Sequence, residues 1–187
     1  MKFKIKFSGA LIAFAVFLLL GGYRFMDAEI ISSYLVAATL HEIGHIVAAK
    51  VCRARIAGIT FDVMGARMHL CGALLSYRDE AVIAFFGPAV NFISAAFFFR
   101  DFPLFSEFSV MLGTFNMLPV TSFDGYRILY SLVALRSGAS TADKVSRLFS
   151  MIFVVLLWLF ATYVLLRYRS GFTLFIFSCL LFFRLYA

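Results

Sequence analysis

The chain has 187 residues, of which 63% are hydrophobic and 14% are charged, and its net charge is +7. Its mean hydropathy of +0.96 lies far above that of an ordinary soluble domain, so the composition indicates a membrane protein. The basic residues fall between apolar segments and form no stripe, which argues against nucleic-acid binding. Three cysteines without a C-x-x-C pair argue against a disulfide framework or a thiolate zinc site.

Six apolar segments are long enough to cross a hydrocarbon core of about 30 Å, which takes roughly 20 residues. They are approximately residues 7–23, 30–51, 80–99, 104–136 (interrupted), 148–166 and 170–186. The sequence therefore predicts an all-α polytopic membrane protein with about six transmembrane helices. We expect a single domain over residues 1–187, with its core in residues 30–136. The first segment has a basic start and an apolar centre, so a cleaved signal peptide is the alternative interpretation.

The segment between the second and third spans has the periodicity of a strand. Ile59, Phe61 and Val63 alternate with polar residues, and the turn signal Met64-Gly65 follows them. We therefore expect a β-hairpin insertion after the second span. Sheet backbone at membrane depth must be covered by protein or line an aqueous cavity, so this hairpin is expected at the membrane surface or beside a site.

The second span contains the ionisable residues His41, Glu42 and His45, in the sequence HEIGH. Ionisable groups are costly inside a membrane, so three of them within five positions require a functional explanation. Residues four apart share one face of a helix, so His41 and His45 can each give a ring nitrogen to one Zn²⁺. Glu42 can then take a proton from a water molecule at the metal. The pattern predicts a hydrolytic site with one zinc per chain.

A catalytic zinc needs a third protein ligand, because the fourth position is kept for water. Asp124 is the strongest candidate, and His69 in the predicted hairpin is the other. Asp124 follows a break in the interrupted span, where Pro119 ends the helix and Gly125 permits an unusual backbone angle. A broken helix that is buried in protein can place such an aspartate in a cavity near the bilayer interior.

The motifs HEIGH and NMLPVTSFDG, in this order and spacing, resemble the site-2 protease family of intramembrane zinc metalloproteases. The pattern of that family is H-E-x-x-H in one span and N-x-x-P-x-x-x-x-D-G in a later, interrupted span. The stretch FFGPAVN, with Gly87, Pro88 and Asn91, resembles the G-P-x-x-N element of the sporulation-type branch. That branch includes the bacterial protease that processes the precursor of sigma-K.

The resemblance implies an intramembrane zinc metalloprotease that hydrolyses a peptide bond in or near a membrane segment of its substrate. The implied site consists of the zinc ligands His41, His45 and Asp124, the general base Glu42, and Asn116 and Pro119, which shape the site. The expected partners are the lipid bilayer, a membrane-associated protein such as a transcription factor precursor, and a regulatory membrane protein. The expected location is a bacterial cell or forespore membrane.

A zinc or other metal transporter is the alternative function, because it can use the same His and Asp ligands. A transporter has no need for a glutamate directly beside the first ligand, and it requires a polar path to both faces of the membrane. The outer halves of the predicted spans offer few polar residues for such a path.

The basic residues predict the orientation of the chain. With the N-terminus in the cytosol, thirteen of the 17 Lys and Arg residues lie on or near the cytosolic side. The four that lie outside are Arg24, Arg100, Arg167 and Arg169. Both termini are then expected in the cytosol. The HEIGH motif lies nearer the cytosolic end of its span, so we expect the active site to face the cytosol.

Overall fold

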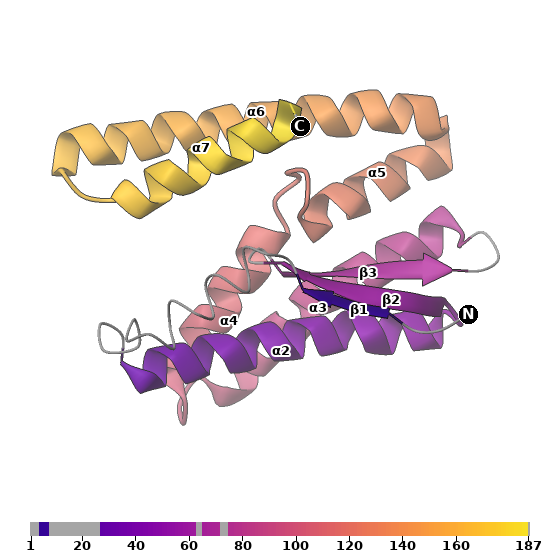
Figure 1. Cartoon of the computed structure of the whole chain (residues 1–187), viewed down its shortest axis with the longest axis horizontal. Coiled ribbons are helices and arrows are strands. Elements are labelled where there is room, and N and C mark those ends of the chain that lie inside the picture. The colour runs from indigo at the N-terminus through magenta and orange to yellow at the C-terminus, as the bar shows by residue number, and fades with distance from the viewer. Residues whose placement is uncertain (1–3, 8–26, 63–64, 72–74, 187) are drawn as a thin grey trace. The chain divides into compact units, whose positions relative to one another are not determined.

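The computed structural model describes residues 4–7, 27–62, 65–71 and 75–186, which form three strands and six helices (Figure 1). The chain divides into two compact units, residues 1–115 and 116–187. The first unit holds the sheet and the helices α2 to α4, and the second holds α5 to α7. The boundary between the units falls at the end of α4, inside the predicted core.

Two long apolar helices, α2 (Ala28–Val51) and α3 (Tyr77–Phe98), pack against each other in the first unit. Their backbones approach closely at Gly44 of α2, where an added Cβ would lie 2.7 Å from the carbonyl oxygen of Phe86 and 3.1 Å from Cα of Gly87. Small residues allow this approach, which strengthens van der Waals packing between helices in a membrane. The crossing fixes the face of α2 that is turned toward α3.

Helix α3 is fixed at its start by Ser76, whose hydroxyl accepts a hydrogen bond from the backbone N–H of Asp79 at 3.1 Å. Farther along, the Asn91 side-chain amide donates to the backbone carbonyl of Ser109 in α4 (Pro103–Asn116), at 3.4 Å.

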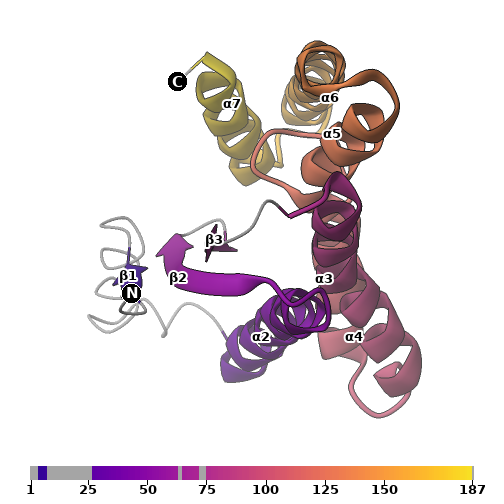
Figure 2. The ribbon, with the colours of Figure 1, turned by 90° about the vertical axis from the view of Figure 1, so that its right-hand side faces the viewer.

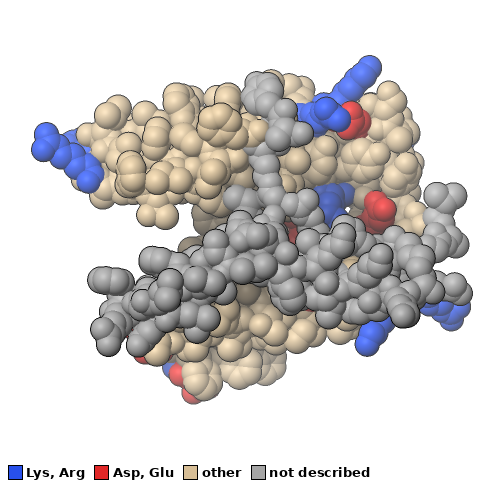
Figure 3. Space-filling view, viewed as in Figure 1, with Lys and Arg blue, Asp and Glu red and all other residues tan. Residues whose placement is uncertain are grey.

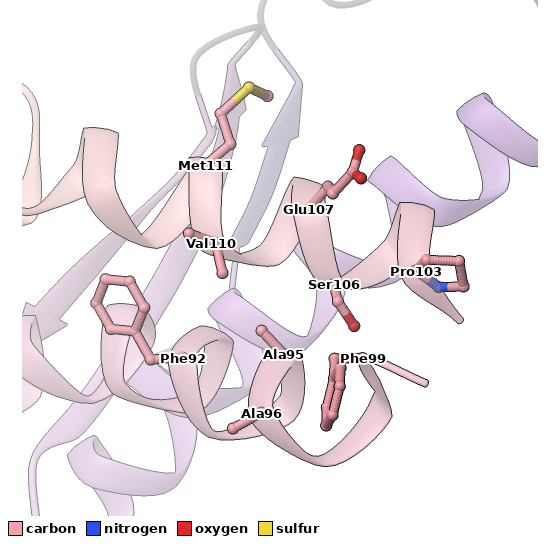
Figure 4. A pocket seen from close by; sticks show the side chains of 9 residues that line it. All are labelled: Phe92, Ala95, Ala96, Phe99, Pro103, Ser106, Glu107, Val110 and Met111. Atoms are coloured by element: carbon pink, nitrogen blue, oxygen red, sulfur yellow. The ribbon is translucent and has the colours of Figure 1, made fainter. Parts of the chain in front are cut away.

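A pocket of about 680 Å³ opens between α3 and α4 (Figure 4). It is lined by Phe92, Ala95, Ala96, Phe99, Pro103, Ser106, Glu107, Val110 and Met111. Its lining contains no predicted site residue, so we assign it no role in the chemistry.

The sheet has the strand order β1-β2-β3 and lies beside α2 (Figures 1 and 2). Strands β2 (Arg55–Asp62) and β3 (Gly65–Cys71) pair antiparallel, where the sequence predicts a hairpin, with a register shift between Ile56 and Gly58. Residues 63–64, which include the predicted turn, lie outside the described residues. Strand β1 (Lys4–Phe7) pairs parallel with β2, from Lys4 opposite Gly58 to Phe7 opposite Phe61.

The second unit begins with a non-helical break and continues with three helices. They are α5 (Asp124–Ser137), α6 (Ala139–Tyr168) and α7 (Phe172–Tyr186). Gly138 joins α5 to α6 at a sharp turn. Its φ of +81° is a backbone angle that a residue with a side chain rarely adopts. The buried face of α6 carries Ala142, Ser146, Ser150, Val154 and Ala161. Their small side chains let α5 and α7 pack against α6.

Among the described residues, three helices are long and apolar enough to cross a membrane: α2, α3 and α6. The predicted number of about six spans is therefore not reached. The interrupted span consists of α4 and α5, each of 14 residues or about 21 Å, and α7 has 15 residues, so none of the three reaches the roughly 20 residues of a full span. The predicted first span, residues 7–23, lies outside the described residues except for Phe7, which belongs to strand β1.

The charge distribution on the second unit agrees with a membrane-crossing helix. Lys and Arg side chains lie at the two ends of α6, and uncharged side chains cover its middle (Figure 3). The 18 most apolar consecutive residues of α6 have a mean hydropathy of 2.5. The described chain is thus a helical membrane protein with a small sheet.

Candidate metal centre

The two histidines of the HEIGH motif converge inside the first unit. His41 and His45 lie one turn apart on α2, and their side chains are buried, with residue exposures of 4% and 5%. Their Nε2 atoms are 3.2 Å apart, and the rings meet edge to face with centroids 4.7 Å apart. Two imidazole nitrogens directed at one point are the arrangement that a shared metal ion requires. The predicted pairing of the histidines on one helix face is confirmed.

The backbone of α3 orients the ring of His45. Its Nδ1 lies 2.7 Å from the carbonyl oxygen of Ile83, a contact that is a hydrogen bond when Nδ1 carries the proton. Nε2 then presents its lone pair toward His41. Metal-binding histidines commonly donate their second ring nitrogen to a carbonyl in this way, which fixes both the tautomer and the ring orientation. No local sequence pattern indicates this partner, because it lies 38 residues away on another helix.

Gly87 of α3 makes room for the two rings. A Cβ at this position would overlap Cε1 and Nε2 of His45 and would lie 3.0 Å from Cε1 of His41. The imidazoles therefore pack against bare backbone. The G-P-x-x-N resemblance included Gly87, but only the structure supplies its physical role at the histidines.

Glu42 follows His41 on α2 and is half-buried. Consecutive residues of a helix point about 100° apart, so Glu42 projects from α2 to one side of the histidine face. A carboxylate in this position can receive a proton from a group held at the histidines. Its predicted role as the general base remains a prediction.

Asp124 is the first residue of α5 in the second unit, and it is buried, with 7% exposure. A carboxylate in the first turn of a helix is stabilised in its ionised form by the helix dipole. Arg127, one turn later, places Nη1 3.5 Å from Oδ1 of Asp124, which adds a favourable charge interaction. Both features favour the ionised form of the Asp124 carboxyl group. His69, the other candidate, lies in β3 opposite Gly58 of β2.

The break before Asp124 differs in one respect from the prediction. Helix α4 ends at Asn116, three residues before Pro119, which fits the expected stop signal. Gly125, however, is helical and has no unusual backbone angle, so that prediction is wrong. A Cβ on Gly125 would instead overlap the carbonyl oxygen of Met117, because the chain folds back across it. The left-handed backbone angle occurs at Ser122, with φ of +87°.

The fold is similar to that of a solved structure, the site-2 protease from Methanocaldococcus jannaschii. The two share a TM-score of 0.70 and 24% sequence identity over 98% of this chain and 89% of that chain. At this identity the similarity establishes the fold. Neither a protein-family model nor a curated protein matches the sequence.

Proposed function

We propose that this protein is an intramembrane zinc metalloprotease of the site-2 protease type. His41, His45 and Asp124 bind one zinc ion, and Glu42 is the general base. The observation that carries the proposal is the buried pair of imidazoles on a membrane-spanning helix, with their Nε2 atoms 3.2 Å apart and a glutamate beside them. The similarity of the whole fold to a site-2 protease supports it.

Asp124 completes the ligand set in this proposal. His41, His45 and Asp124 are all buried, and each offers one ligand atom of the kind that zinc binds. Two neutral imidazoles and one carboxylate are also the donor set of known catalytic zinc sites. The donor atoms of these three residues, two imidazole nitrogens and one carboxylate oxygen, are therefore of the types that a catalytic zinc ion binds.

Zinc, when bound, acidifies a water molecule to a pKa of about 7 and polarises the carbonyl group of the peptide bond. Glu42 accepts the proton of the attacking water and passes it to the departing amine. Ile83 keeps the proton of His45 on Nδ1 through its carbonyl oxygen, which leaves Nε2 as the metal-facing atom. Gly87 keeps the space at the two rings clear of side chains.

The substrate is, in our proposal, a membrane-associated protein that is presented as an extended strand. A helical segment hides its peptide carbonyls in hydrogen bonds, so hydrolysis requires local unwinding. The three-stranded sheet supports strand addition, because the order β1-β2-β3 leaves one side of β3 at the edge among the described strands. A transcription factor precursor, released into the cytosol by the cut, fits the predicted orientation. The G-P-x-x-N element in α3 supports a placement near the sporulation-type branch.

The first prediction separates metal binding from proton transfer. Glu42→Gln should retain full zinc but reduce cleavage of a co-expressed membrane substrate by about 10²–10⁴-fold, the usual contribution of a general base. His41→Ala and Asp124→Ala should lose most of the zinc as well. Zinc content in detergent and the amount of cleaved product are the two measurements.

The control for this experiment is Glu107→Gln, which removes the charge of an exposed glutamate on α4 and should behave as the wild type. Wild-type cleavage by Glu42→Gln would contradict the role of Glu42 as the general base, whereas a wild type that binds zinc but cleaves no substrate would favour a metal-transport role. Full zinc in Asp124→Ala would remove Asp124 from the ligand set.

A further inference from the structure

The non-helical break before Asp124, residues 117–123, is hydrogen-bonded to α6, a helix of the same unit, through Ser150. We propose that Ser150 of α6 is a positioning residue for Asp124, because its hydroxyl holds the backbone of Thr121 and thereby the start of α5. The inference rests on the proposed function, in which Asp124 is a zinc ligand. It assigns to α6 a part in building the site, beyond its role as a membrane-spanning helix.

Ser150 engages two polar groups of Thr121 at once. Its Oγ accepts a hydrogen bond from the backbone N–H of Thr121 at 2.9 Å and lies 3.0 Å from the hydroxyl Oγ1 of the same residue. Ser150 is completely buried. One contact holds the backbone of Thr121 and the other holds its side chain, so both parts of the residue are tied to α6. Thr121 is half-buried, and a backbone N–H that loses its partner where water has little access is unfavourable, so this contact helps to hold the path of the break.

The chain from Thr121 to Asp124 is too short and too constrained to absorb a displacement. Ser122 holds φ of +87°, a conformation that residues with side chains rarely adopt and that the neighbouring contacts must maintain. Phe123 is buried and donates its backbone N–H to the carbonyl of Val120 at 2.9 Å, and Val120 is also buried. A shift at Thr121 therefore reaches Asp124 within three residues.

Packing alone does not account for the Ser150 hydroxyl. Ser146, one turn earlier on the same face of α6, is equally buried, but its hydroxyl has no hydrogen-bond partner within the described part of the chain. Ser146 is thus small because neighbouring helices pack closely there. Ser150 is equally small, and in addition its oxygen is used by the break. The two serines form a matched pair for an experiment.

The experiment compares the full-length wild type with Ser150→Ala, Ser146→Ala, Thr121→Ala and Thr121→Ser in detergent. Zinc affinity is measured by competition with a chelator, and the ligand field is measured from the absorption of the Co²⁺-substituted protein. The melting temperature of the metal-free protein reports packing. Ser150→Ala should bind zinc about tenfold more weakly, the lower range found for outer-shell partners of metal ligands, and should change the Co²⁺ spectrum.

The other variants test whether the loss of zinc affinity follows the hydrogen bonds between Ser150 and Thr121. Thr121→Ala should lose less affinity than Ser150→Ala, since its backbone N–H still donates to Ser150, and Thr121→Ser should restore the wild-type value. Ser146→Ala should match the wild type in zinc affinity and Co²⁺ spectrum. A purely structural role predicts a lower melting temperature of the metal-free protein with unchanged zinc affinity.

The inference is overturned if Ser150→Ala keeps the affinity and spectrum of the wild type, or if Ser146→Ala loses as much affinity. If Ser150→Ala does not fold, Thr121→Ala decides: a wild-type affinity in that variant overturns the inference. A wild-type protein that binds no zinc refutes the proposed function itself, and this inference with it. Zinc bound normally by the wild type and by every variant removes the role of Ser150 alone.

Discussion

At the residue scale, the positions of the two imidazole rings depend on Gly87, which has no side chain to occupy their space. His41 and His45 pack against Gly87 of α3, and the crossing of α2 with α3 at Gly44 holds that backbone in place. Both rings are buried and lie between two helices, so neither can rotate away without disturbing the packing. The geometry of the proposed metal centre is therefore sensitive to a single methyl group.

The corresponding prediction is that Gly87→Ala loses zinc. The new methyl group would overlap the ring of His45, and the displaced ring would no longer direct Nε2 at the metal, so we expect about 10–100-fold weaker binding. Gly113→Ala on α4 is the control, because the nearest atoms to its Cβ would be the edge of the Phe92 ring at 3.1 Å and Cβ of Asn91 at 3.4 Å, and none would belong to the histidines. Equal zinc affinity in both variants would show that Gly87 does not set the ring positions.

Residue spacing was enough to predict the histidine pair, because a helix fixes the relation of positions four apart regardless of its surroundings. It was not enough to explain Gly125, whose importance comes from the path of Met117 across it. The partners Ile83 and Ser150 were also not predicted. Both lie on other helices, and contacts between distant parts of a chain are set by packing that a local pattern does not contain.

At the scale of elements, the alternation of Ile59, Phe61 and Val63 before a turn signal predicted a β-hairpin, and β2 and β3 pair antiparallel in that segment. Strand β1 was missed. Its four residues are followed directly by a long apolar run, which was assigned to the first span. A strand of four residues also has too short a pattern to be recognised without its partner β2. The interrupted span was predicted from Pro119, but the lengths of α4 and α5 could not be, because the break uses seven residues.

The sheet carries a prediction of its own. If it guides the substrate, replacing Ile59 and Phe61 together by serine should lower cleavage about tenfold while zinc content stays at the wild-type level, because each lost apolar contact in a binding site is worth about 1–3 kcal/mol. The alternation of side chains along a strand predicts that Ile59 and Phe61 share one face and that Thr60 belongs to the other. Thr60→Ala is therefore the control. Undiminished cleavage of the natural substrate by the double variant would remove the sheet from substrate binding.

At the scale of the whole molecule, the proposed function makes orientation the feature that decides which proteins can be substrates. The distribution of Lys and Arg predicts that the start of α2 lies outside and the start of α6 in the cytosol. In a protein without its native cysteines, Ser140→Cys should resist a membrane-impermeant thiol reagent until the cells are opened. Asp27→Cys should react in intact cells. The opposite pattern would invert the topology and exclude substrates that release a cytosolic fragment.

The parallel pairing of β1 with β2 also determines when the sheet can form during synthesis. Lys4 to Phe7 are synthesised about fifty residues before their partners, Gly58 to Phe61, so the first strand has no partner while α2 is being made. During that wait Lys4 and Lys6, alternating with Ile5 and Phe7, give the unpaired strand a charge that discourages pairing with other chains. The sheet can thus be completed only after the helix that carries the histidines has been synthesised.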